Sequence, residues 1–198
     1  TPESVRVALS SVDNATGEIL AEYGGKDYQE IQINAATQDI AMAGSTFKPF
    51  ALVPFLESGG SMTDRFNGNS PLEIQNLEVE NSGGVSYGSV TANQAVRKSI
   101  NTAFAEINEA AGPQNTMDAL IAAGIPEDTP GLEPTLLNVL GFASPHNIDI
   151  THAYSTLANG GERITPHIVR EVLNSRGNQI YQAVAPREEV FSAETISA

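Results

Sequence analysis

The N-terminal forty residues have the pattern of a β-hairpin followed by a polar stretch. Apolar residues such as Val5, Val7 and Leu9 recur through residues 5–12, and residues 18–23 are again rich in apolar side chains. Between these two runs, residues 13–17 contain the Asp, Asn and Gly residues that favour tight turns. We therefore predict two strands joined by a turn, and then an irregular polar segment over residues 24–40.

The middle of the chain has helical periodicity broken by glycine and proline. A helix is predicted from Ser45 to about Leu56, ended by Gly59 and Gly60. Residues 61–87 predict irregular structure with short extended pieces at 72–74 and 77–79. Further helices are predicted at residues 91–99, 102–111, 115–123 and 148–159, and a second hairpin at residues 168–173 and 179–183 around a turn at 175–178.

The order of strands, helices and strands predicts an α/β or α+β fold in which a helical segment interrupts an antiparallel sheet. With 198 residues and 40% hydrophobic content, the chain can bury one sizeable core, so we expect residues 1–198 to belong to one domain. Residues 188–198 resemble the start of an element, and we expect the fold to be incomplete in this chain.

Composition narrows the classes of partner and cofactor. The 10 basic and 24 acidic residues give a formal net charge of −14, which disfavours nucleic acid as a partner. The absence of cysteine excludes disulfides and thiolate chemistry. His146, His152 and His167 lack metal-ligand spacing, so we expect all three to be surface or packing residues. The chain has no apolar run long enough to span a bilayer, so we expect any membrane anchor to lie outside it.

Ser45 and Lys48 are the first candidate catalytic residues. They stand three positions apart at a predicted helix start, so both side chains lie on one helix face about a turn apart. A serine becomes a good nucleophile when a base takes its proton, and lysine can be that base when burial keeps it partly neutral. The helix start also favours developing negative charge. Taken alone, however, these residues ordinarily form a helix cap followed by a solvated lysine.

A longer set of residues resembles a known family. The run Ala43-Gly44-Ser45-Thr46-Phe47-Lys48-Pro49-Phe50 is similar to the active-site segment of class A, bifunctional penicillin-binding proteins. Ser99-Ile100-Asn101 then stands where that family has its S-x-N motif. The likeness covers nearly the whole chain, including residues 13–17, 23–25, 36–38, 81, 87–88, 90–91, 95–96, 102–104, 140–141, 153–154 and 157–161.

The resemblance implies the penicillin-binding protein and serine β-lactamase-like transpeptidase fold. It also implies a peptidoglycan D,D-transpeptidase of the bacterial cell wall, an enzyme that needs no metal or organic cofactor. Ser45 would attack the penultimate carbonyl of a stem peptide ending in D-Ala-D-Ala, and Lys48 would take its proton. Ser99 would relay a proton to the departing D-alanine, and Asn101 would bind the substrate amide. β-Lactams would acylate Ser45, and the enzyme would work outside the cytoplasmic membrane, anchored by a segment not present here.

The sequence departs from the family at its third motif, K-T-G. The lysines are Lys26, Lys48 and Lys98, and none precedes Thr-Gly or Ser-Gly. We therefore expect residues 1–198 to be the N-terminal portion of one transpeptidase domain, ending before the K-T-G strand. The natural chain is expected to continue by roughly 100 residues. This C-terminal remainder of the domain would complete the fold, also as a second polypeptide, and the fragment alone is expected to be inactive. Ala43 is a smaller departure, because the family often has proline there.

Two other functions remain open. A D,D-carboxypeptidase or β-lactamase would use the same fold with water as the acyl acceptor. A catalytically silent module that binds cell-wall peptide is favoured by the missing K-T-G motif, although the presence of Ser45, Lys48, Ser99 and Asn101 counts against it. Outside these four residues, Lys98 is expected to be a solvated charge. Asn81 is expected either to line the substrate cleft or to stabilise a turn.

Overall fold

The computed structural model describes residues 5–198, which separate into two compact units. The first unit runs up to Ala41 and also contains Ala122–Pro126 and Pro145–Ala193. The second unit contains Met42–Ile121, Glu127–Ser144 and Glu194–Ala198. Each unit is described by itself, and the assignment of residues 1–198 to a single domain remains a prediction.

The first unit begins with the predicted hairpin. Strands β1 (Leu9–Val12) and β2 (Ile19–Tyr23) pair antiparallel, and the prediction of a hairpin is confirmed. The Asp13 carboxylate closes the turn by accepting the backbone N–H groups of Ala15 and Thr16, both at 2.9 Å. Short polar side chains of this kind stabilise turns by bonding to the backbone just after them.

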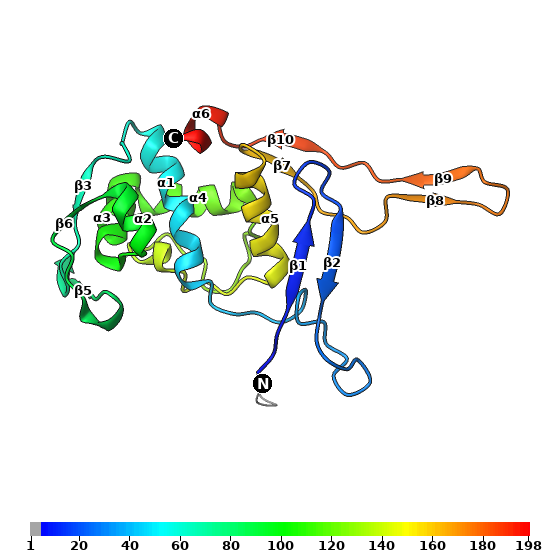
Figure 1. Ribbon diagram of the computed structural model, residues 1–198, viewed down its shortest axis with the longest axis horizontal. Coiled ribbons are helices and arrows are strands. Elements are labelled where there is room, and N and C mark those ends of the chain that lie inside the picture. Colours follow the sequence, from blue (N-terminus) through cyan, green and yellow to red (C-terminus); the bar gives the residue numbers. More distant parts are fainter. Residues whose placement is uncertain (1–4) are drawn as a thin grey trace. The chain divides into compact units, whose positions relative to one another are not determined.

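Helix α5 (Asn147–Ala158) covers the hairpin, as the gold helix beside the blue strands in Figure 1 shows. In its first turn the His146 backbone N–H donates to the Asp149 carboxylate at 3.0 Å. Ser10 of β1 donates to the Asn147 side chain at 2.8 Å, which ties the strand to the start of the helix. The helix ends before Gly160, as predicted.

The rest of the first unit consists of short antiparallel pairs. Strand β7 (Glu162–Ile164) pairs with β10 (Arg187–Glu189), and β8 (Glu171–Leu173) pairs with β9 (Gln179–Gln182). The pair of β8 and β9 is the predicted second hairpin, which is confirmed. His167 forms a parallel bridge with Glu18, just before β2, so the chain after β7 returns to the first hairpin.

The second unit carries most of the helices. In chain order its elements are η1 (Gly44–Phe47), α1 (Lys48–Glu57), β3 (Arg65–Asn67), β4 (Leu72–Ile74), β5 (Leu77–Val79), η2 (Ser82–Gly84), β6 (Ser89–Thr91), α2 (Ala92–Lys98), α3 (Asn101–Ala111), α4 (Pro113–Ala123) and η3 (Asn138–Leu140). The last two residues of α4 belong to the first unit, and a final helix, α6 (Ala193–Ser197), begins in the first unit and ends in the second.

Helix α3 forms the centre of the core in the second unit. Its residues Phe104 and Ile107 are fully buried and pack with Ala51 and Phe55 of α1 and with Val139 of η3. In Figure 1, α1 in cyan and α2 and α3 in green lie together. Full burial of each such large apolar side chain stabilises the fold by about 1.5–3 kcal/mol, so this packing fixes α1 against α3.

The structure refines two sequence predictions. All the helices expected at residues 45–159 are present, but the first opens with the 3-10 turn η1 before α1. Within residues 5–198 the strands form five separate two-stranded sheets rather than one continuous sheet. Pairing of β3 with β6 was missed because each strand has three residues, too short to show a period. None of the helices in this range is long and apolar enough to cross a membrane.

Candidate active site

The four candidate residues all belong to the second unit, where four elements position them. Ser45 lies on η1, and Lys48 is the first residue of α1. Ser99 follows the last residue of α2, and Asn101 begins α3. The packing of α1 against α3 therefore brings two motifs that are about fifty positions apart in the sequence to one place.

Ser45 is presented on a tight and exposed turn. Gly44 before it has φ +57°, a left-handed conformation that glycine adopts without strain. The Ser45 carbonyl accepts the backbone N–H of Lys48, which closes the turn and starts α1. Among residues 5–198, no hydrogen bond holds the Ser45 hydroxyl, and the side chain is exposed. The hydroxyl is thus accessible to an incoming ligand.

Lys48 is buried, with 2% of its surface exposed, and its ammonium is fully hydrogen-bonded. Nζ donates to the Ser99 carbonyl at 2.8 Å, to Ser99 Oγ at 3.0 Å and to Asn101 Oδ1 at 2.6 Å. Nζ also lies 5.5 Å from the centre of the Phe104 ring. All three acceptors are neutral oxygens, so the amine is held in place without a carboxylate partner.

Burial lowers the pKa of Lys48 from 10.5 to about 8. Removal from water disfavours the charged ammonium, and this desolvation is the cause of the shift. A lysine with this pKa is neutral in a substantial fraction of molecules near neutral pH. It can therefore accept a proton, which an ordinary surface lysine does only rarely.

Ser99 has a backbone conformation that is unusual for its residue type. Its φ of 53° and ψ of 47° lie in the left-handed region. An L-residue other than glycine pays about 1–2 kcal/mol for this conformation. The conformation ends α2 and lets both the carbonyl and the hydroxyl of Ser99 meet the Lys48 amine. Strain of this kind is often found at functional sites.

Asn101 joins Lys48 to the segment after β5. Its Nδ2 donates to the Glu80 carbonyl at 2.8 Å, which leaves Oδ1 facing Lys48. The neighbouring Asn81 is buried and donates Nδ2 to the carbonyls of Gly68 and Val85, both at 2.9 Å. Asn81 Oδ1 accepts the backbone N–H of Thr102 at 3.1 Å. Asn81 thus joins the backbone at Gly68 and Val85 to the start of α3.

The contacts of two residues near the site were not predicted from the sequence. Phe104 stood in the family likeness without a role, and only the fold shows that its ring borders the Lys48 amine. Gly141 was part of the family likeness, but its contact with Gly44 is made through the fold alone. Lys98, expected to be a solvated charge, is exposed and lies with Nζ 5.0 Å from the centre of the Tyr87 ring.

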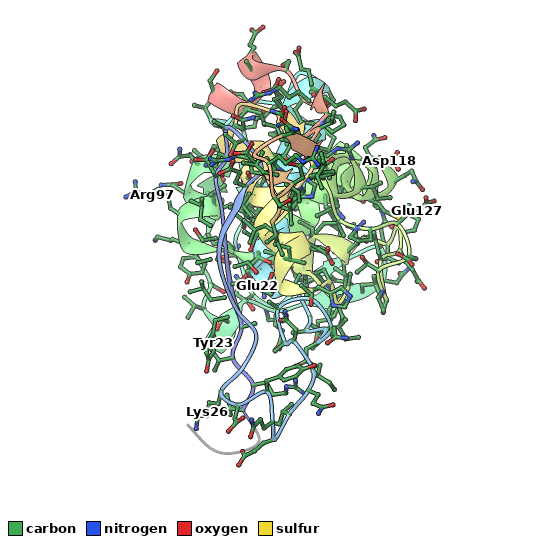
Figure 2. The ribbon with its side chains drawn as sticks, turned by 90° about the vertical axis from the view of Figure 1, so that its right-hand side faces the viewer. Glu22, Tyr23, Lys26, Arg97, Asp118 and Glu127 are labelled. Carbon is green, nitrogen blue, oxygen red and sulfur yellow. The ribbon has the colours of Figure 1, made fainter. Side chains whose placement is uncertain are left out.

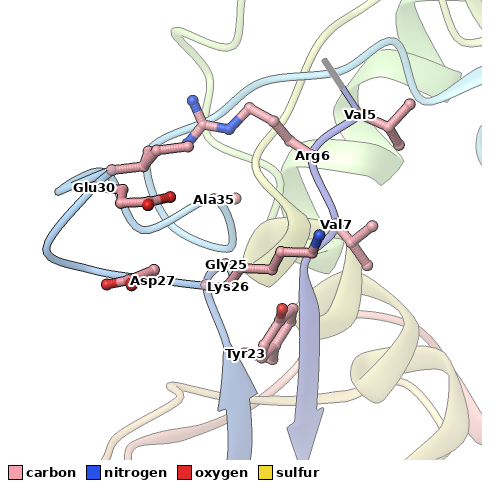
Figure 3. A pocket seen from close by; sticks show the side chains of 11 residues that line it. Val5, Arg6, Val7, Tyr23, Gly25, Lys26, Asp27, Glu30 and Ala35 are labelled. Atoms are coloured by element: carbon pink, nitrogen blue, oxygen red, sulfur yellow. The ribbon is translucent and has the colours of Figure 1, made fainter. Parts of the chain in front are cut away.

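A cavity of about 630 Å³ lies elsewhere, in the first unit. Figure 3 shows it between residues 5–7 and the segment after β2, with Arg6, Lys26, Asp27 and Glu30 around it. Lys26 lies beyond Tyr23 at the end of β2, as Figure 2 shows. None of the four candidate residues lines this cavity. Within residues 5–198, no cluster of His, Cys, Asp or Glu could hold a metal ion.

Comparison with curated proteins finds relatives along most of the chain. Penicillin-binding protein 1A of Mycolicibacterium smegmatis is 33% identical over 196 residues, covering 90% of this chain and 24% of that protein. The protein of the same name from Mycobacterium tuberculosis is 33% identical over 196 residues, covering 90% and 23%. The chain thus spans about a quarter of the length of these relatives.

Solved structures agree with the sequence comparison. PonA1 from Mycobacterium tuberculosis matches with a TM-score of 0.87 and 27% identity, over 99% of this chain and 54% of that one. Its complex with penicillin V matches with a TM-score of 0.86 and 28% identity, over the same shares. The family model of the penicillin-binding protein transpeptidase domain matches residues 8–198. The chain therefore belongs to the penicillin-binding protein transpeptidase domain family, and the predicted fold class is confirmed.

Proposed function

We propose that this chain is part of a peptidoglycan D,D-transpeptidase that works through an acyl-enzyme on Ser45. The observation that carries the proposal is the Lys48 amine, buried and bonded to Ser99 Oγ and Asn101 Oδ1, three residues after an exposed serine. This arrangement supplies a nucleophile, a base with a lowered pKa and a second hydroxyl within reach of that base.

In the acylation step, Ser45 Oγ forms a bond to the penultimate carbonyl carbon of a stem peptide ending in D-Ala-D-Ala. Neutral Lys48 takes the hydroxyl proton. When the carbon–nitrogen bond breaks, the proton moves from Lys48 Nζ through Ser99 Oγ, 3.0 Å away, to the departing D-alanine amine. The backbone N–H of Ser45 lies at the start of η1 and stabilises the developing oxyanion.

In the second step, an amine of a neighbouring stem attacks the acyl-enzyme and forms the cross-link. Asn101 is proposed to bind the amide of the donor peptide while it holds Lys48 in place. β-Lactams are proposed to acylate Ser45 in the same way, since PonA1 has been solved with penicillin V and shares this fold. Given this substrate, the site is proposed to face the outside of the cytoplasmic membrane.

The test is a turnover assay on the full-length protein with a donor peptide ending in D-Ala-D-Ala and an acceptor amine. We expect a cross-linked product and released D-alanine, both lost in Ser45→Ala. Ser58→Ala, which removes a hydroxyl bonded to the Phe55 carbonyl at the end of α1, is the matched control and should retain turnover. Hydrolysed donor without cross-link would assign a carboxypeptidase, and no turnover in a folded protein would contradict an enzymatic role.

A further inference from the structure

The turn that carries Ser45 is held by a second segment of the chain. The Gly44 backbone N–H donates to the Gly141 carbonyl at 2.8 Å, and the Ala43 backbone N–H donates to the Ala143 carbonyl at 2.9 Å. These two bonds pair the residues before the candidate nucleophile with residues 141–143, much as two strands pair. All of these residues belong to the second unit.

The two segments approach so closely that only glycine fits at position 141. A Cβ built on Gly141 would lie 2.0 Å from the Gly44 carbonyl oxygen and 2.4 Å from the Gly44 nitrogen. Ordinary van der Waals contact begins at 3.4 Å. The three nearest atoms all belong to the Gly44 backbone, so rotation of a side chain cannot relieve the clash. Gly141 also has φ +74°, which again favours glycine.

The segment that carries Gly141 is anchored to the core. Asn108 of α3 is buried and donates Nδ2 to the Leu136 carbonyl at 2.7 Å and to Asn138 Oδ1 at 2.9 Å. Asn138 in turn donates Nδ2 to the Pro113 carbonyl at 2.9 Å. Helix α3 therefore supports both Lys48 and the turn that carries Ser45. It begins with Asn101, which holds Lys48, and it fixes the loop that holds Gly44.

We propose that Gly141 is a positioning residue for the nucleophile. Its close contact sets the Gly44 backbone, and thereby the direction of the Ser45 hydroxyl and backbone N–H relative to Lys48. This role rests on the proposed acyl-transfer function. It adds a residue that sets the position of Ser45 although it lies about a hundred positions from Ser45 in the sequence. A simpler role, as a left-handed residue that ends η3, would require φ +74° but not the contact with Gly44.

The matched variants are Gly141→Ala and Gly160→Ala in the full-length protein. Gly160 has φ +71°, and a Cβ there meets nothing within 4 Å, so it carries the same backbone cost without the clash. Acylation by a fluorescent penicillin is followed by stopped flow, which separates the initial binding constant from the acylation rate constant. Displacement of the Ser45 turn by about 1 Å should slow acylation by roughly 100-fold in Gly141→Ala, with little change in initial binding and no change in Gly160→Ala.

Equal acylation rates in the two variants would overturn the positioning role, provided the wild-type protein is acylated at Ser45. Absence of an adduct in the wild type would instead overturn the proposed function, and this role with it. Amide hydrogen exchange of the wild type tests the contact even where Gly141→Ala fails to fold. The Ala43 and Gly44 amides should be protected, and exchange at the rate of exposed amides would contradict the pairing.

Discussion

The charge state of Lys48 is the property of the site most open to a quantitative test. With a pKa of about 8, roughly a tenth of the Lys48 side chains are neutral at pH 7. At the ordinary pKa of 10.5 the neutral share would be about 300-fold smaller. Acylation should therefore speed up about tenfold from pH 6 to pH 7 and level off above the Lys48 pKa.

Asn101→Asp perturbs this property through a single change of charge. The new carboxylate would replace an amide oxygen that lies 2.6 Å from Lys48 Nζ. An opposite charge at this distance typically shifts a pKa by about 1–3 units, and here it raises the pKa of Lys48. The neutral fraction at pH 7 then falls by roughly 10- to 1000-fold, and the acylation profile moves to higher pH.

The assay is stopped-flow acylation by a fluorescent penicillin between pH 6 and pH 10. Asn101→Leu is the control, because it removes the amide without adding a charge; it should lower the rate without raising the midpoint. Lys48→Arg keeps a cation that does not lose its proton and should abolish acylation. A wild-type rate that does not change between pH 6 and pH 9, or an Asn101→Asp midpoint equal to that of the wild type, would refute the assignment of Lys48 as the base.

Three further predictions concern the stability of the fold. Ser99→Gly should be more stable than Ser99→Ala by about 1 kcal/mol in urea unfolding, because glycine relieves the strain of the left-handed backbone. Both variants lose the proton relay, and equal stability of the two would contradict the strain. Asn81→Ala should lower the free energy of unfolding by about 3 kcal/mol, since buried backbone groups lose their partners, and a loss below about 1 kcal/mol would contradict the network. Burial and the nearby Arg163 charge lower the pKa of His152. The unfolded state then binds the proton more readily, so thermal stability should fall as pH drops below about 6.5, and His152→Gln should flatten that dependence.

The local elements were predictable because their signals lie close together in the sequence. Turn residues at 13–17 and glycines at 59–60 and 160–161 mark ends that the structure reproduces. The spacing of Ser45 and Lys48 placed both at one helix start. The family likeness then added Ser99 and Asn101, and the fold brings these two to Lys48, although their roles remain proposals.

The remaining features depend on contacts between distant segments and could not be predicted. The left-handed backbone of Ser99 follows from the junction of α2 and α3, and serine has no intrinsic preference for it. The lowered pKa of Lys48 depends on burial beside Phe104, which only the packing of α1 on α3 produces. Gly141 had no role beyond the family likeness until the fold placed the Gly44 backbone against it.

The central claim is that Ser45 forms the acyl-enzyme, and intact-mass spectrometry after incubation with a penicillin tests it most directly. The full-length protein should gain the mass of one penicillin, and peptide mapping should place the adduct on Ser45. Ser45→Ala should stay unmodified while its thermal unfolding matches that of the wild type. An adduct that persists in Ser45→Ala, or a folded wild-type protein that gains no mass, would contradict the account.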